Sequence, residues 1–151
     1  MTEVLDIKAK APWPAGALSN FASHPFTFDG VGCASMEGLL QSLKIADPAE
    51  QERVCSLAGP VAQSVGRTHD WRVVGTLWWR GVPYDRLSDA YQALLDRAYQ
   101  ALYAQSKTFR DALAATETAQ LTHSFGKDDP CETILTTEEF LSRLERLRRA
   151  A

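Results

Sequence analysis

Apolar residues recur every three or four positions through the second half of the chain, a spacing that is typical of amphipathic helices. We expect a long helix over residues 84–103 and a second helix over residues 107–115. A last helix follows Thr136, which forms a capping box with Glu139. The apolar positions are Leu87, Tyr91, Leu94, Leu95, Ala98 and Leu102 in the long helix, and Phe140, Leu144 and Leu147 in the last one.

The first half of the chain predicts shorter elements that are separated by turn residues. Asp29 and Gly30 lie among alternating apolar and polar residues, which indicates a β-hairpin over residues 26–31. Ser35 is a suitable N-cap for the following helix, which we expect over residues 36–46.

A second pair of short helices is predicted by start and stop signals. Asp47 is a suitable N-cap, Pro48 suits the first helical position, and Glu50 is the acid of a capping box, so we expect a helix over residues 48–58. A further helix begins at the next Gly-Pro pair and ends at a glycine, which places it over residues 59–66.

The remaining segments suggest a few short strands. Residues 6–8 and 121–124 are expected to be extended, while residues 71–79 suit either a strand or a buried helical turn. The sequence has no internal repeat and no low-complexity linker. We therefore expect the α+β class, as a mostly helical single domain with a few short strands over residues 1–151.

The composition is that of an ordinary globular protein, and it argues against some classes of function. Hydrophobic residues make up 45% of the 151 residues, and the formal net charge is -3. This balance disfavours a protein that mainly binds nucleic-acid backbones, although a local cluster of donors is enough for one phosphorylated small molecule. No apolar run approaches the roughly 20 residues of a membrane span, and we expect no secretory signal.

The cysteines and histidines are scattered along the chain, which argues against a disulfide framework and a zinc site. No two cysteines have Cys-x-x-Cys spacing. We therefore expect a reduced, cytoplasmic protein that holds no metal and needs no cofactor. The residues concerned are Cys33, Cys55, Cys131, His24, His69 and His123.

A polar stripe on the helix predicted at residues 36–46 raises the question of function. Glu37, Gln41 and Lys44 lie on one face of this helix, because positions i, i+4 and i+7 nearly superpose at 3.6 residues per turn. Two interpretations are open. The stripe is either a solvated surface, as most such stripes are, or one wall of a pocket in which Glu37 does chemistry.

The neighbourhood of this stripe resembles the opening motif of the NADAR superfamily, which is also called YbiA-like. In that superfamily "SNF", an apolar-Asp-Gly hairpin and a helix-opening "Ser-x-Glu" with downstream Gln and Lys occur in the same order and at about this spacing. The matching residues here are Ser19-Asn20-Phe21, Phe28-Asp29-Gly30, Ser35-Met36-Glu37, Gln41 and Lys44.

The resemblance extends over residues 16–128, with departures near its end. Many members carry a Lys-Phe pair in the long helix, where this chain aligns Leu102 and Tyr103. Members also have a Glu where this chain has His123, and an Asp that aligns with Asp128. The sequence "DPCETILT" replaces their glycine-rich loop.

The resemblance implies an α+β fold and the cleavage of an N-glycosidic bond in an ADP-ribosyl-nucleobase or a related ribosyl conjugate. Such cleavage passes through an oxocarbenium-like state, and a carboxylate near the anomeric carbon can stabilise it, act as nucleophile or activate water. A general acid would instead need a pKa raised by burial, and the sequence leaves these roles open. Glu37 is the candidate carboxylate, and the helix dipole is expected to favour its ionised form. His123 and Asp128 are candidates for a second acid or base. The candidate ligand-binding residues are Ser19, Asn20, Phe21, Gln41, Lys44, Arg67 and Trp71.

Two other functions are open on the sequence. The departures from the family pattern favour a module that binds ADP-ribose or an NAD-type ligand without turnover. We expect Trp78 and Trp79 to be largely buried, with Arg80 outward, whereas an exposed patch at the two tryptophans would indicate a scaffold that associates with itself or with a partner. The substrate is a small molecule or is linked to nucleic acid, and a homo-oligomer is possible.

Overall fold

The computed structural model describes residues 3–150, which have the predicted α+β fold of helices with a few short strands. Residues 1, 2 and 151 of the expected domain lie outside the described residues. The helices are η1 (Ala15–Leu18, a 3-10 helix), α1 (Met36–Ser42), α2 (Pro48–Cys55), α3 (Gly59–Gly66), α4 (Asp89–Gln105), α5 (Lys107–Ala115) and α6 (Thr137–Ala150). The strands are β1 (Val4–Asp6), β2 (Phe26–Phe28), β3 (Val31–Cys33), β4 (Thr76–Trp79), β5 (Val82–Asp85) and β6 (Gln120–Thr122).

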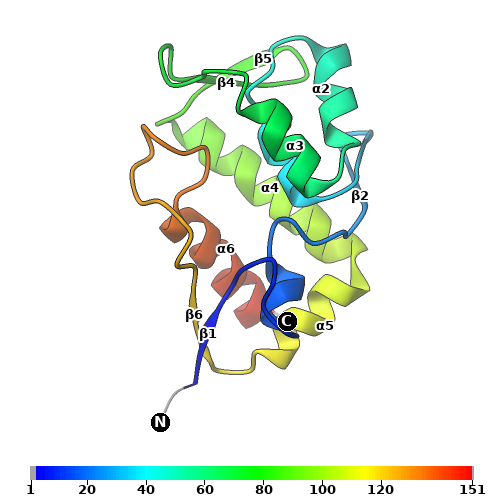
Figure 1. Cartoon of the computed structure of the whole chain (residues 1–151), viewed down its shortest axis with the longest axis vertical. Helices are drawn as coiled ribbons and strands as arrows, with labels where there is room; N and C mark the ends of the chain where they lie inside the picture. Colours follow the sequence, from blue (N-terminus) through cyan, green and yellow to red (C-terminus); the bar gives the residue numbers. More distant parts are fainter. Residues whose placement is uncertain (1–2, 151) are drawn as a thin grey trace.

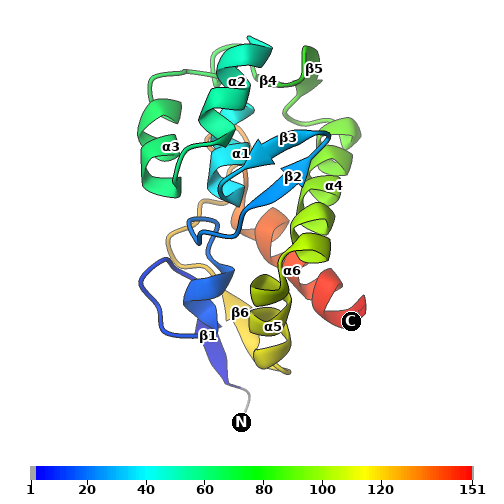
Figure 2. The same cartoon turned by 90° about the vertical axis from the view of Figure 1, so that its right-hand side faces the viewer.

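Helix α4 crosses the centre of the view in Figure 1 and lies along one side of the molecule in Figure 2, with α1, α2 and α3 towards one end of the molecule and β1, β6 and α5 towards the other. The strands form three separate pairs. The pairs β2–β3 and β4–β5 are antiparallel hairpins, whereas β1 pairs in parallel with β6. The β1–β6 pair joins segments that are distant in the sequence.

The predicted hairpin at Asp29 and Gly30 is present. Both residues have positive φ angles, 48° and 81°, as a two-residue turn between paired strands requires. The hairpin packs onto the main hydrophobic core, where Phe28 stacks on Trp79 with ring centroids 5.2 Å apart. Trp79 is buried, so the hypothesis of an exposed Trp78–Trp79 patch is wrong for this tryptophan.

The long helix α4 begins later than the apolar spacing predicts. Residues 84 and 85 belong to strand β5, and the helix starts only after Ser88, whose hydroxyl accepts a hydrogen bond from the Tyr91 amide. Leu87 was expected on the buried stripe, but it is 66% exposed, because it lies before the cap. The local cap therefore sets the start of this helix, and the apolar spacing does not.

The other boundaries differ by a few residues. Helix α1 ends at Ser42, before the predicted end at residue 46, and α2 ends at Cys55. Within residues 71–79, only the last four form a strand, and a turn precedes them. The strands expected at residues 6–8 and 121–124 begin two residues and one residue earlier, respectively. Among the described residues, no helix is long and apolar enough to cross a membrane.

Candidate functional site

A cavity of about 410 Å³ lies where the start of α1 meets α3 and the segment between β6 and α6. Of the ten site residues predicted from sequence, nine line it and Asp128 does not. The nine are Ser19, Asn20, Phe21, Glu37, Gln41, Lys44, Arg67, Trp71 and His123. The polar stripe of α1 is therefore a cavity wall, and its interpretation as a solvated surface is wrong.

Two hydrogen bonds at the first turn of α1 place Glu37. The Ser35 hydroxyl accepts a hydrogen bond from the Gly38 amide at 3.1 Å, which fixes the first turn of α1. The Glu37 amide donates to the Asn20 carbonyl oxygen at 2.9 Å, so the Asn20 loop is tied to the same turn. The Glu37 side chain is only 9% exposed.

Gln41 orients the Glu37 carboxyl. Its Nε2 donates to Glu37 Oε1 at 2.7 Å across one helical turn. The other end of the amide, Gln41 Oε1, is buried without a hydrogen-bond partner among the described residues. Gly66 makes room for this amide, because a Cβ at position 66 would stand 1.8 Å from Gln41 Oε1.

Burial raises the pKa of the Glu37 carboxyl above its ordinary value, and the hydrogen bond from Gln41 and the charge of Lys44 only partly offset it. This corrects the expectation that the helix dipole favours the ionised form. Helix α1 has only seven residues, so its dipole is small, whereas the loss of water around Glu37 is nearly complete. Glu37 thus has the raised pKa of a group that exchanges protons.

Asn20 is oriented by a residue that the sequence did not single out. The Tyr99 hydroxyl, from the middle of α4, donates to Asn20 Oδ1 at 2.7 Å. Burial, with the nearby charge of Glu37, raises the pKa of Tyr99 well above its ordinary value, so this hydroxyl remains a donor. The Asn20 NH₂ group is then left to serve a ligand in the cavity.

Three cationic side chains line the same cavity: Lys44 just after α1, Arg67 at the end of α3, and Lys127 from the β6–α6 segment. Burial lowers the pKa of Lys44; the charge of Glu37 partly offsets this effect, and Arg72 and Arg67 add to it. Arg67 is exposed, and its guanidinium contacts Gln63 Oε1 at 3.4 Å. This cluster suits a ligand that carries negative charge.

His123 enters the cavity wall from the end of β6. Its Nδ1 lies 2.7 Å from the Ile7 carbonyl oxygen, and the ring packs edge-on against Phe140 with centroids 5.1 Å apart. A carbonyl oxygen can only accept, so Nδ1 carries the hydrogen, and Nε2 is the acceptor of the neutral ring.

Asp128 is exposed and lies outside the cavity lining, although the family alignment made it a candidate acid or base. The backbone beside it is tied to the start of α6, since the Lys127 carbonyl oxygen accepts from the Thr137 amide. A different carboxylate reaches the cavity mouth. Glu132 lines the cavity and accepts a hydrogen bond from Arg72 at 3.1 Å. In the sequence, the segment "DPCETILT" indicated only that the glycine-rich loop of the superfamily is missing. No signal in the surrounding residues identified Glu132 as a site residue.

Aromatic rings flank the cavity. Phe21 and Trp71 were predicted to lie there, and Phe125 joins them. Phe125 is 75% exposed, yet the loop that carries it is held on both sides: Ser124 donates twice to Asp6, and Gly126 leaves no room for a side chain beside Thr137. These rings offer stacking surfaces for a planar ligand group.

No group of three or more His, Cys, Asp or Glu residues within residues 3–150 is placed to hold a metal ion. The arrangement instead combines a buried carboxyl, a histidine, an amide, cations and aromatic rings. Such a set can bind a charged, planar ligand and move protons.

Comparisons with known proteins place the chain among phage proteins. The family model described as "Bacteriophage protein GP30.3" matches residues 12–149. An uncharacterized 17.1 kDa protein from the Gp30-rIII intergenic region of Enterobacteria phage T4 is 42% identical over 149 residues, which cover 95% of this chain and 96% of that protein.

A solved structure supports the fold. The NMR structure of the E. coli protein YbiA superposes with a TM-score of 0.66, at 18% sequence identity, over 99% of this chain and 84% of that one. This likeness confirms the YbiA-like fold that the motifs between residues 16 and 44 had indicated.

Proposed function

The chain belongs to the family described as Bacteriophage protein GP30.3, and from that premise we propose that it is an N-glycosidase. Its substrate is an ADP-ribosyl-nucleobase or a related ribosyl conjugate, as a small molecule or linked to nucleic acid. The main support is the cavity, because it brings nine predicted site residues together around one buried carboxyl with a raised pKa.

Glu37 is the catalytic carboxylate of this proposal. Breaking a ribose C1–N bond develops positive charge on the sugar, which a carboxylate beside C1 stabilises. A raised pKa also makes that carboxylate a better base for the attacking water, because proton transfer is most effective when the pKa approaches the working pH. Gln41 holds the carboxyl in place during both steps.

The departing base requires a proton donor and an aromatic surface on which it can stack. His123 is the second proton-transfer group of the proposal: in its doubly protonated, imidazolium form it donates the Nε2 proton to the departing base and becomes neutral, while Nδ1 keeps its hydrogen on the Ile7 carbonyl oxygen. Phe125 and Trp71 line the cavity as aromatic surfaces for the base, a contact worth about 1–3 kcal/mol per stacked base.

The rest of the ligand is anionic. Lys44, Arg67 and Lys127 bind its phosphates, and the NH₂ group of Asn20 donates to a ribose hydroxyl. A cavity of about 410 Å³ falls within the range of small-molecule sites, roughly 300–1,000 Å³.

The direct test measures release of ADP-ribose from an ADP-ribosylated nucleobase or oligonucleotide by wild type, Glu37→Gln and Glu52→Gln. Glu52 is exposed on α2 and serves as the matched control. We expect Glu37→Gln to lose activity by about 100-fold or more, the range of general acid–base catalysis, and Glu52→Gln to match wild type. Equal activity of all three proteins would remove Glu37 from the mechanism.

A second candidate is a binding module without turnover. The observation that favours it is Leu102, which is buried in α4 where many superfamily members carry a lysine. Calorimetry with ADP-ribose separates the two functions. Binding by wild type without hydrolysis of any ribosyl substrate would support the module, whereas absence of binding would exclude it.

A further inference from the structure

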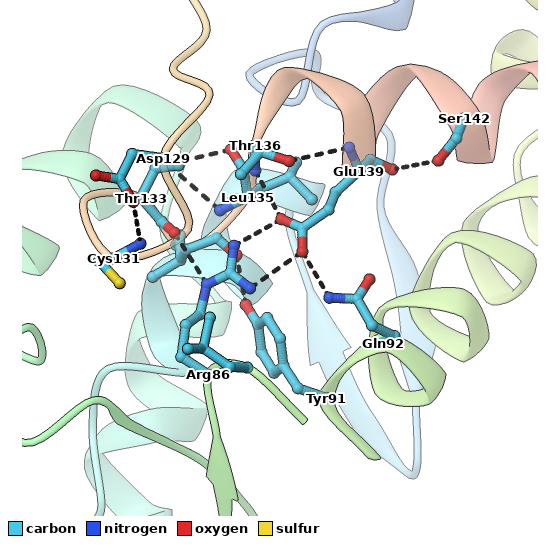
Figure 3. A network of polar contacts seen from close by, with 12 residues as sticks. Arg86, Tyr91, Gln92, Asp129, Cys131, Thr133, Leu135, Thr136, Glu139 and Ser142 are labelled. Carbon is cyan, nitrogen blue, oxygen red and sulfur yellow. Dashed lines mark hydrogen bonds and ion pairs between the residues drawn. The ribbon is translucent and has the colours of Figure 1, made fainter. Parts of the chain in front are cut away.

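We propose that Arg86 and Tyr91 are positioning residues that clamp one wall of the cavity, a role that rests on the proposed N-glycosidase function. The wall consists of Thr133, Ile134 and Leu135, which line the cavity ahead of α6. Both residues come from the other side of this wall, Arg86 from just after β5 and Tyr91 from the first turn of α4, and neither lines the cavity. Figure 3 shows the clamp.

Arg86 holds the wall in two ways. It bonds to a backbone carbonyl group of the wall, and it pairs with a side chain of α6, the helix that follows the wall. Its Nε donates to the Thr133 carbonyl oxygen at 3.0 Å. Its two terminal nitrogens form a bidentate pair with Glu139, at 2.6 and 3.0 Å, in the first turn of α6. The arginine is 2% exposed, so these bonds are shielded from water.

Tyr91 holds the next residue of the wall. Its hydroxyl donates to the Ile134 carbonyl oxygen at 2.6 Å, and its ring packs against the Arg86 guanidinium, 4.9 Å from Cζ to the centroid. The tyrosine is fully buried. Two successive carbonyl groups of the wall, those of Thr133 and Ile134, therefore have buried partners outside the wall itself.

Glu139 completes the clamp on the helix side. Its Oε1 accepts from the Thr136 amide at 2.7 Å, while its Oε2 accepts from Gln92 Nε2 at 2.6 Å. Burial would raise the pKa of Glu139, but the hydrogen bonds from Arg86, Thr136 and Gln92 outweigh it and lower the pKa. The carboxylate thus stays charged and satisfied.

The wall has little support of its own. Its internal contacts are a turn closed at Asp129 and two bonds between Thr133 Oγ1 and Leu135. An irregular segment of this kind keeps a fixed shape only where outside groups satisfy its backbone. The clamp supplies those groups and keeps the cavity shape needed to bind the ligand.

The test compares Tyr91→Phe with Tyr103→Phe. Both changes remove one hydroxyl from α4, but only Tyr91 donates to the wall. Three quantities are measured: hydrogen exchange of the Thr133, Leu135 and Thr136 amides, the dissociation constant of ADP-ribose, and kcat and KM for base release.

We expect Tyr91→Phe to accelerate exchange of these three amides, in the wall and directly after it, at least tenfold more than that of the α1 amides, and to weaken ADP-ribose binding about tenfold. Tyr103→Phe leaves both unchanged. A purely structural role would accelerate exchange equally throughout the protein, and that result would overturn the proposal. Loosened wall amides with wild-type binding and kinetics would overturn it as well.

The charged part of the clamp is tested with a double variant, because removing only one charge of the Arg86–Glu139 pair would leave the other buried without a partner and destabilise the fold. Arg86→Met with Glu139→Gln removes both charges and keeps an acceptor for the Thr136 amide. We expect it to fold and to show the same selective loosening. If wild type itself neither binds ADP-ribose nor releases base, the proposed function fails, and the exchange pattern still decides whether the clamp holds the wall.

Discussion

The Tyr99 hydroxyl and Asn20 Oδ1, 79 residues apart in sequence, are joined by a 2.7 Å hydrogen bond beneath the cavity. This bond ties the central helix α4 to the loop that precedes Glu37. Because Oδ1 is occupied, the amide nitrogen of Asn20 is the group presented to a ligand. The bond thus decides which hydrogen-bonding group the cavity offers.

We predict that Tyr99→Phe weakens ADP-ribose binding and lowers kcat/KM about tenfold, the effect of losing about 1.4 kcal/mol. The loss follows because the Asn20 amide can rotate once its partner is gone. Calorimetry and steady-state kinetics measure the two effects. Tyr103→Phe is the matched control, and a Tyr99→Phe variant that binds like wild type would show that Asn20 needs no orientation.

Glu37→Gln is predicted to make the protein more stable at pH 7 while abolishing activity. The folded-state pKa of Glu37 is raised by burial, so the folded protein binds this proton more tightly than the unfolded chain. Its contribution to stability is therefore greatest below the ordinary value near 4.5 and is lost as the pH rises through the folded pKa.

Thermal unfolding at pH 7 and pH 4 tests whether the Glu37 contribution to stability decreases as the pH rises. The Tm of Glu37→Gln should exceed that of wild type at pH 7, and the difference should shrink at pH 4. Glu52→Gln should show neither effect, since its side chain is exposed. A lower Tm for Glu37→Gln at pH 7 would mean that the carboxylate stabilises the fold.

Glu139→Gln is predicted to have the opposite pH dependence. The pKa of Glu139 is lowered in the folded protein, so its contribution is fully present above the ordinary value near 4.5 and is lost as the pH falls through the folded pKa. Leaving Arg86 without its partner should cost about 3–5 kcal/mol at neutral pH. Urea unfolding at pH 7 and pH 3 should show this cost shrinking in acid, with Glu138→Gln as the exposed control.

Gly66→Ala is predicted to impair the site through Gln41. The new Cβ would stand 1.8 Å from Gln41 Oε1 and 2.7 Å from its Cδ, so the amide must move and release Glu37. We expect activity to fall at least tenfold and stability to fall by about 1–3 kcal/mol. Gly32→Ala is the control, since its Cβ would meet no atom within 4 Å. Unchanged kinetics for Gly66→Ala would show that Gln41 does not orient the carboxyl.

Asp128→Asn and Glu132→Gln separate the aligned carboxylate from the one at the cavity mouth. Asp128 is exposed outside the cavity, so its variant should keep wild-type kcat/KM. Glu132 lines the cavity, and removing its charge releases Arg72 from the pair and should change KM for an anionic substrate severalfold. Loss of activity in Asp128→Asn alone would restore the aligned acid to the mechanism.

Short motifs predicted the first wall of the site well, because its residues lie close together in sequence. Ser35, Glu37 and Gln41 belong to one short capped helix, where the spacing alone determines which side chains share a face. The hairpin at Asp29 and Gly30 was equally local. For these elements, local rules and the final fold agree.

The second wall could not be predicted, because it depends on contacts between distant segments. Tyr99 occupies a helical position beside Ala98 and looks like an ordinary core residue until Asn20 is placed next to it. Likewise, Glu132 reaches the cavity only because Arg86 and Tyr91 fix the segment that follows it. Burial also reversed the expected direction of the Glu37 pKa shift, and burial is a property of the whole fold.

The parallel pairing of β1 with β6 sets when the cavity can form during protein synthesis. His123 takes its place by bonding to Ile7, 116 residues earlier in the chain. A nascent polypeptide leaving the ribosome therefore carries β1 unpaired until Gln120–Thr122 has emerged. Assembly of the cavity is consequently a late event of translation, and truncated products that end before β6 would lack the wall that carries His123.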